Sequence, residues 1–212
     1  MLLTHEKLKE AIQLGKIRFE PYNEDQISIN SIDVRIGFDL WEMVTTDQPF
    51  RDIYCPTEKN WKPIQTILAS EVRAAMPSWA LGVIPDNCPV FLLEPGKFYL
   101  ATTLEKIGTI YQSDEEVQII PRMAAKSTTG RQGLTVAICA GVEELHFHSR
   151  WALEVRVVDA GIVPIAVGTW LGQVTFEEGY NTDQIYDGPD RYQNKEEVRF
   201  LPKPIKWTDP TK

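Results

Sequence analysis

From Ile17 onward the chain is a succession of short runs rich in Val, Ile, Phe, Tyr and Thr, separated by Pro, Gly, Asn and Asp. The first group fits pleated, half-buried strands, and the second favours turns. The runs are residues 17–20, 32–37, 80–84, 90–94, 98–107, 116–121, 134–140, 151–158, 163–167 and 170–177. Their regular recurrence predicts a mainly β fold, a sandwich or barrel of antiparallel strands.

One helix is expected before the strands. Residues 4–15 carry apolar side chains at helical spacing, with Thr4 as a candidate N-cap and Gly15 as a stop. A chain of 212 residues with 43% hydrophobic content is ample for one large domain. We therefore predict a single domain over 1–212, with an irregular excursion at 45–70 and a C-terminal tail at 179–212 that can close over a ligand.

Charge and cysteine content exclude several classes of function. The net charge of −8 argues against general binding to nucleic acid or to an anionic membrane, because both need a dominant basic face. Cys55, Cys88 and Cys139 are too far apart for a zinc ribbon or a C-x-x-C motif, which predicts reduced core thiols. No apolar run approaches the roughly 20 residues of a membrane helix, so a cytoplasmic location is expected, or host cytoplasm for a virus-encoded chain.

The segment from Lys126 to Glu154 is the candidate site. Its loop, K-S-T-T-G-R-Q-G, offers hydroxyls and two cations, Lys126 and Arg131. It is not a Walker A motif, because Lys126 precedes the glycines. Ser127 can open a short helix whose free N–H groups bind phosphate oxygens. The alternative is a capped surface turn.

Glu154 is the one carboxylate in the apolar run W-A-L-E-V. Burial there would favour the protonated form of the carboxyl group and suit it to proton transfer. The alternative is an exposed strand residue paired with Arg150 or Arg156.

These two features together resemble the dCTP deaminase branch of the dUTPase superfamily. K-S-T-T-G-R-Q-G fills the place of the family's R-S-S-L-x-R-x-G loop, and Leu153-Glu154 follows at the family's separation. Matching segments are G-K-I-R-F-E-P, S-I-N-S-I-D-V-R-I-G, P-G-K-F-Y-L-A-T-T-L-E-K-I, V-P-I-A-V-G-T-W-L-G-Q-V-T-F-E-E and Y-D-G-P-D-R-Y-Q-N-K. The resemblance implies a dUTPase-like distorted β-barrel or jelly-roll with an N-terminal helix and few short helices.

The resemblance also implies a reaction, the hydrolytic deamination of dCTP to dUTP and ammonia. Glu154 would act as general base and then general acid, while Ser127 and Arg131 position the attacking water. The main chain at Ala140 would fix the pyrimidine edge. Zinc-dependent pyrimidine deaminases need H-x-E and P-C-x-x-C motifs, which this chain lacks, so no zinc is expected.

Further substrate contacts follow from the same resemblance. They are Lys126, Thr128, Ala140, Glu144, Ala152, Leu153, Gln173, Tyr186, Arg191, Tyr192 and Lys195. Mg²⁺ would accompany the triphosphate without protein side chains as ligands. The family also implies a homotrimer, with active sites built by loop, hairpin and tail from different subunits.

The chain departs from the family in the hairpin 143–149, which lacks the usual Pro and Gly. Glu144 stands at the family's aspartate, and Lys126 replaces an Arg, which removes bidentate geometry. His146 and His148 could share a strand face but have no apparent third metal ligand. The substrate therefore stays open among dCTP, dCMP and a modified cytosine nucleotide. Two other functions stay open as well, a bifunctional enzyme that forms dUMP and diphosphate and a non-catalytic nucleotide-binding regulator.

Overall fold

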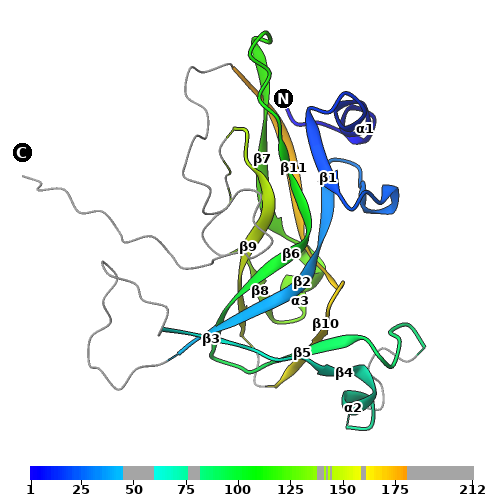
Figure 1. The fold of residues 1–212 in the computed structure, drawn as a ribbon, viewed down its shortest axis with the longest axis vertical. Helices are drawn as coiled ribbons and strands as arrows, with labels where there is room; N and C mark the ends of the chain where they lie inside the picture. Colours follow the sequence, from blue (N-terminus) through cyan, green and yellow to red (C-terminus); the bar gives the residue numbers. More distant parts are fainter. Residues whose placement is uncertain are drawn as a thin grey trace, which may run out of the picture.

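The computed structural model describes residues 1–44, 60–75, 82–137, 141, 143, 145–158 and 161–180, and strands make up about half of them (Figure 1). The strands are β1 Ile17–Glu20, β2 Ile32–Met43, β3 Trp61–Pro63, β4 Ile67–Leu68, β5 Pro89–Leu93, β6 Phe98–Thr109, β7 Val117–Ala125, β8 Leu134–Val136, β9 His148–Val157, β10 Val163–Ala166 and β11 Trp170–Tyr180. The helices are α1 His5–Gln13, η1 Glu24–Gln26, α2 Ala69–Arg73 and α3 Ser127–Arg131. The predicted mainly β fold is confirmed.

The main sheet has the order β7-β11-β2-β6-β9-β8, with β1 paired to β6 and β3 paired to β2. Its two ends meet after β8, where Met123 N–H donates to Gly141 O at 3.0 Å and Glu143 N–H donates to Pro121 O at 3.3 Å. The sheet therefore curls into the predicted distorted barrel. A second antiparallel sheet, β10-β5-β4, lies at one end of the molecule beside α2 (Figure 1).

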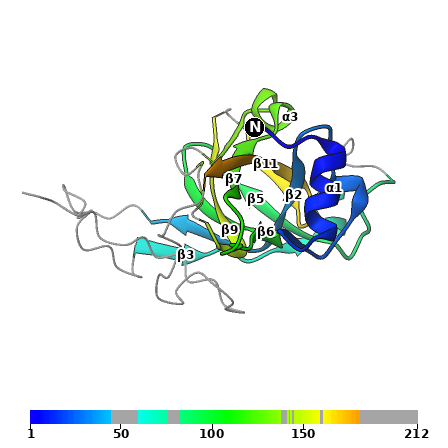
Figure 2. The same cartoon turned by 90° about the horizontal axis from the view of Figure 1, so that it is seen from above.

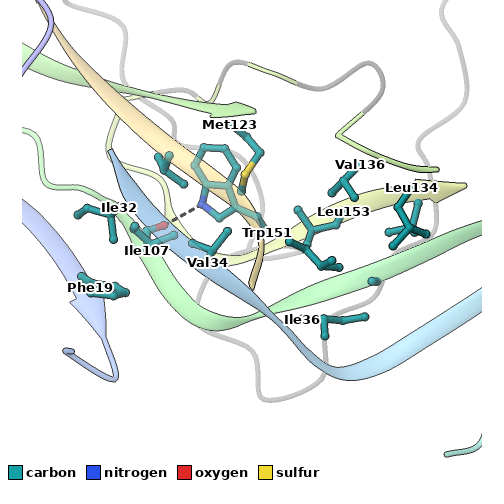
Figure 3. Close-up of a cluster of buried hydrophobic side chains, with 14 of the residues drawn as sticks. Phe19, Ile32, Val34, Ile36, Ile107, Met123, Leu134, Val136, Trp151 and Leu153 are labelled. Carbon is teal, nitrogen blue, oxygen red and sulfur yellow. Dashed lines mark hydrogen bonds between the residues drawn. The ribbon is translucent and has the colours of Figure 1, made fainter. Parts of the chain in front are cut away.

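In β9 the core of the barrel is built by alternation along the strand. In β9, Trp151, Leu153 and Val155 are all at most 3% exposed, while the residues between them face outward. Figure 3 shows the Trp151 ring among core side chains, with its Nε1–H donating to Ile107 O at 2.8 Å. Because successive strand residues point to opposite faces, this alternation places Glu154 on the outer face of the barrel.

The predicted N-terminal helix is confirmed as α1. Leu8 and Ala11 are buried against the barrel, and Gly15 has the positive φ of 72° that ends a helix. Thr4 is the N-cap residue, as predicted, although its side chain makes no capping hydrogen bond. Seen from above, α1 lies beside β2 on the opposite side of the body from β3 (Figure 2).

Three predicted segments differ from the structure. In the expected strand at 80–84, residues 82–84 form a turn and bend, with Gly82 at φ of 74°. Val83 is left in solvent, while Ile84 packs against the small core cluster beside α2. The strand expected at 134–140 ends at Val136 within the described chain. In the segment 45–70, expected to be irregular, the described part pairs as β3 and β4.

His148, the first residue of β9, has a ring nitrogen, Nε2, that is buried and has no partner among the described residues. Burial lowers the pKa of His148 because it penalises the charged imidazolium. Nearby Glu20 opposes this shift, whereas Arg18 and Lys106 reinforce it. The unfolded chain therefore takes up a proton on this histidine at a pH where the folded chain does not.

We expect the free energy of unfolding to fall as the pH drops through about 6.5, the ordinary histidine value, and His148→Gln to weaken this dependence. The measurement is urea unfolding at pH 7.5 and pH 5.5 for the wild type and the variant. His5→Gln, which changes a half-buried histidine of α1, is the control. An unchanged pH dependence in the His148 variant would contradict this assignment.

Candidate active site

The loop predicted to bind phosphate forms the short helix α3, which joins β7 to β8. It is anchored to β11 through one carbonyl. Lys126 N–H donates to Leu171 O at 3.2 Å, and the Thr129 hydroxyl donates to the same oxygen at 3.3 Å. The Lys126 backbone is thus fixed where β7 ends, so its side chain starts from a defined place on the sheet.

The Lys126 side chain has two partners that the sequence did not indicate. Its Nζ lies 2.5 Å from Asp33 Oδ2 in β2, and the Asp33 side chain is only 6% exposed. The same Nζ lies 5.1 Å from the centre of the Trp170 ring in β11, a cation–π distance. Lys126 is therefore held between β2 and β11.

Gln173, the predicted substrate glutamine, belongs to the same cluster. It lies directly opposite Asp33 in the β11–β2 pairing and opposite Ala124 in the β11–β7 pairing. Directly opposed residues share one face of a sheet, so Gln173 and Asp33 lie side by side. The structure thus brings two predicted substrate contacts, Lys126 and Gln173, together around a buried carboxylate.

A cavity of about 430 Å³ opens beside this cluster, within the usual range for small-ligand pockets. Lys126 and Thr128, both predicted substrate contacts, line it. Its other polar residues are Thr129, Gln132 and Thr169, and its apolar walls come from Ile84, Leu134, 163–166, Trp170 and Leu171. A cation and hydroxyl groups at the wall of an otherwise apolar pocket suit an anionic group on an organic ligand.

The other predicted residues of α3 are exposed. Ser127, Thr128 and Arg131 have their side chains toward solvent on the surface of this helix. They are accessible to a ligand or to another protein chain. Gly133, which follows α3, accepts a hydrogen bond from Val158 N–H at 2.9 Å and thereby leads the chain back to β9.

Glu154 is half-buried, so the burial expected for it is only partial in the single chain. Its main-chain oxygen accepts a hydrogen bond from Ala137 N–H at 3.0 Å, and Leu100 of β6 lies opposite it. Ala152 is exposed on the same face. Leu153 is fully buried in the core, which leaves only its main chain to contact a substrate.

Glu154 belongs to β9, whereas Lys126 lies at the end of β7. Leu134, which lines the cavity beside Lys126, pairs with Val157 of β9, three residues from Glu154. At about 3.3 Å per residue, Glu154 is roughly 10 Å along β9 from that pair. Glu154 itself does not line the cavity.

Six predicted substrate contacts lie outside the described residues, namely Ala140, Glu144, Tyr186, Arg191, Tyr192 and Lys195. Across the described ranges, no three His, Cys, Asp or Glu side chains are grouped so that they could hold a metal ion. In the same part of the chain, no helix has the length and apolar character to cross a membrane.

Asp33 and Trp170 are the site residues that sequence reasoning missed. Asp33 is a charged residue inside an apolar strand run, and this position alone is only weak evidence that a residue belongs to a binding site. Trp170 opens its strand and looks like an ordinary strand aromatic. Their contact with Lys126 depends on how β2, β7 and β11 align, which the sequence does not state.

A family model described as dCTP deaminase-like matches residues 2–179. The chain belongs to this family. The predicted resemblance is confirmed, as is the prediction of a dCTP deaminase-like enzyme.

Relatives of the family carry one common name. The chain is 27% identical to the dCTP deaminase, dUMP-forming, of Methanobrevibacter smithii, over 83% of this chain and 79% of the relative. It is 25% identical to the protein of that name in Streptomyces griseus, over 92% and 89%. It is 30% identical to the one in Leptospira biflexa, over 74% and 71%.

A solved structure supports the fold. The 2'-deoxycytidine 5'-triphosphate deaminase from Agrobacterium tumefaciens matches with a TM-score of 0.52 at 15% identity. The match covers 84% of this chain and 48% of that chain. At this identity the likeness bears on the fold alone.

Proposed function

We propose that this protein deaminates dCTP, with Glu154 as general base and acid and with the cavity beside Lys126 receiving the phosphates. The observation that carries the proposal is the convergence of two family motifs: Lys126 and Thr128 line the cavity, and Lys126 and Gln173 both lie beside the buried Asp33 carboxylate. Lys126 and Thr128 come from the α3 loop and Gln173 from β11, and their polar groups suit phosphate oxygens.

In the proposed reaction, Glu154 takes a proton from water as the water oxygen bonds to cytosine C4. The proton passes from Glu154 to N3. Glu154 then takes the proton of the new C4 hydroxyl and gives it to N4, and the C4–N4 bond breaks as the C4 carbonyl forms and ammonia leaves. Ser127 and Arg131, exposed on α3, would position the water and steady Glu154. Mg²⁺ would arrive bound to the phosphate oxygens, where it supplies charge neutralisation.

Glu154 does not line the cavity beside Lys126, which supports a site shared between copies of the chain. A nucleotide that contacts both residues would then draw them from different protomers. The family resemblance implies a homotrimer, and we propose that assembly here. Exposed Ser127 and Arg131 are then free to face a neighbouring Glu154.

For the product we favour dUMP and diphosphate over the dUTP expected from the sequence. The relatives named above are all called dUMP-forming, which supports hydrolysis of the triphosphate after deamination. A second water would then attack at the α-phosphate, activated by Glu144 or a nearby acid.

The test is incubation of the protein with dCTP, dCMP and dUTP while ammonia and diphosphate are measured. We expect dCTP to yield both products in equal amounts. Release of ammonia without diphosphate would show that the product is dUTP. Diphosphate without ammonia would sink the deaminase proposal, and neither product from any nucleotide would favour a regulatory nucleotide-binding protein.

Lys126→Met is expected to raise KM for dCTP about 10- to 100-fold with little change in kcat, because a charge-assisted hydrogen bond to phosphate contributes roughly 1.5–3 kcal/mol. Lys126→Arg should retain most of the affinity. Steady-state kinetics make the measurement, with Lys62→Met on β3 as the control and thermal unfolding to confirm folding. An unchanged KM in the Met variant would remove Lys126 from the phosphate site.

A further inference from the structure

Asp33 is a buried residue with an unusual set of contacts. Its main-chain oxygen accepts from Gln26 Nε2 at 2.7 Å, and its Oδ2 pairs with Lys126 at 2.5 Å. Its Oδ1 is buried and has no hydrogen-bond partner among the described residues. Asp33 is 4% exposed as a residue and does not line the cavity, whereas Lys126 does. The carboxylate thus lies behind the ammonium group as seen from the cavity.

We propose that Asp33 is an internal counter-anion of Lys126, which sets the affinity of the cavity for phosphate. This inference rests on the proposed role of Lys126. An anion in the cavity is attracted by the ammonium group and repelled by the carboxylate directly behind it. Since Asp33 is held in the interior of the sheet, it cannot move away when the anion binds, and its charge is poorly screened by solvent.

The position of Lys126 does not depend on the Asp33 charge alone. Its main-chain N–H is bonded to Leu171 O, and the Trp170 ring lies 5.1 Å from its Nζ. An amide oxygen at position 33 would still accept a hydrogen bond from Nζ. Asp33→Asn therefore removes the charge while leaving the lysine in place, which separates an electrostatic role from a purely structural one.

The experiment measures the dissociation constant of inorganic tripolyphosphate, and KM and kcat for dCTP, in wild type and Asp33→Asn. We expect the variant to bind tripolyphosphate about tenfold more tightly and to show a lower KM. The tighter binding should shrink as salt is raised. Glu177→Gln, which changes net charge equally but lies in an exposed pair with Arg122, should leave both constants unchanged.

Equal or weaker tripolyphosphate binding by folded Asp33→Asn would overturn the counter-anion role. If the Asn variant does not fold, Asp33→Ser, which also removes the charge, is measured in its place with the same criterion. The two proposals fail separately. If Lys126→Met binds tripolyphosphate as tightly as the wild type, the phosphate role of Lys126 is rejected. If Lys126→Met binds more weakly but Asp33→Asn does not bind more tightly, only the role of Asp33 is rejected.

Discussion

Glu154→Gln is expected to lower kcat for dCTP about 10²- to 10⁴-fold, the range that a positioned general acid–base residue contributes. The amide keeps the shape and hydrogen-bonding capacity of the side chain but cannot accept the proton of the attacking water. Since Glu154 is outside the core and half-buried, the fold should be unaffected. The measurement is ammonia release in steady state, with dCTP binding followed by calorimetry.

The matched control is Glu94→Gln, which makes the same chemical change at an exposed carboxylate paired with Lys97. It should retain wild-type turnover. The Glu154 variant should also keep the affinity for dCTP and the mass of the assembled protein. A Glu154→Gln protein that deaminates at the wild-type rate would remove the mechanism proposed here.

The second large effect is expected at Gly108, in the interior of the barrel. This residue pairs with Arg18 of β1 on one side and His148 of β9 on the other. A Cβ atom there would lie 1.8 Å from Phe147 O and 2.8 Å from His148 Cα, both backbone atoms. Because both neighbouring strands are held by ladder hydrogen bonds, neither can move aside without breaking the pairing.

Gly108→Ala should therefore destabilise the fold by more than about 3 kcal/mol, beyond ordinary overpacking of a core. A loss of this size is a large part of the usual 5–15 kcal/mol of domain stability, so little folded protein is expected. Gly161→Ala is the control, since a Cβ at that position meets nothing within 4 Å. Equal unfolding midpoints for the two variants in urea would contradict the register of β9 on β6.

The positions of strands and helices could be predicted from the sequence where the local pattern of apolar and β-favouring residues was strong. The run of β-favouring residues at 151–158 predicted β9, and the apolar stripe with Leu8 and Ala11 predicted α1, because each local pattern matches the element that it forms. The turn at 82–84 was mistaken for a strand because Val83 is apolar. Local composition does not reveal that an apolar side chain is left in solvent.

The candidate site was harder to predict from the sequence than the strands and helices. Lys126 and Gln173 were proposed through family motifs, and the structure places them in one cluster. Asp33 is distant in sequence from both, and only the alignment of β2 with β11 brings it into contact. The place of Glu154 relative to this cluster was likewise hidden, since it depends on the register of β8 and β9.

The central expectation is that the protein removes the amino group of cytosine from dCTP. The most direct measurement is ammonia release from dCTP by the wild-type protein with Mg²⁺ present, alongside Glu154→Gln at the same concentration. We expect ammonia to accumulate in step with a uracil nucleotide for the wild type and to be nearly absent for the variant. A folded wild-type protein that binds dCTP yet releases no ammonia would contradict the proposed function.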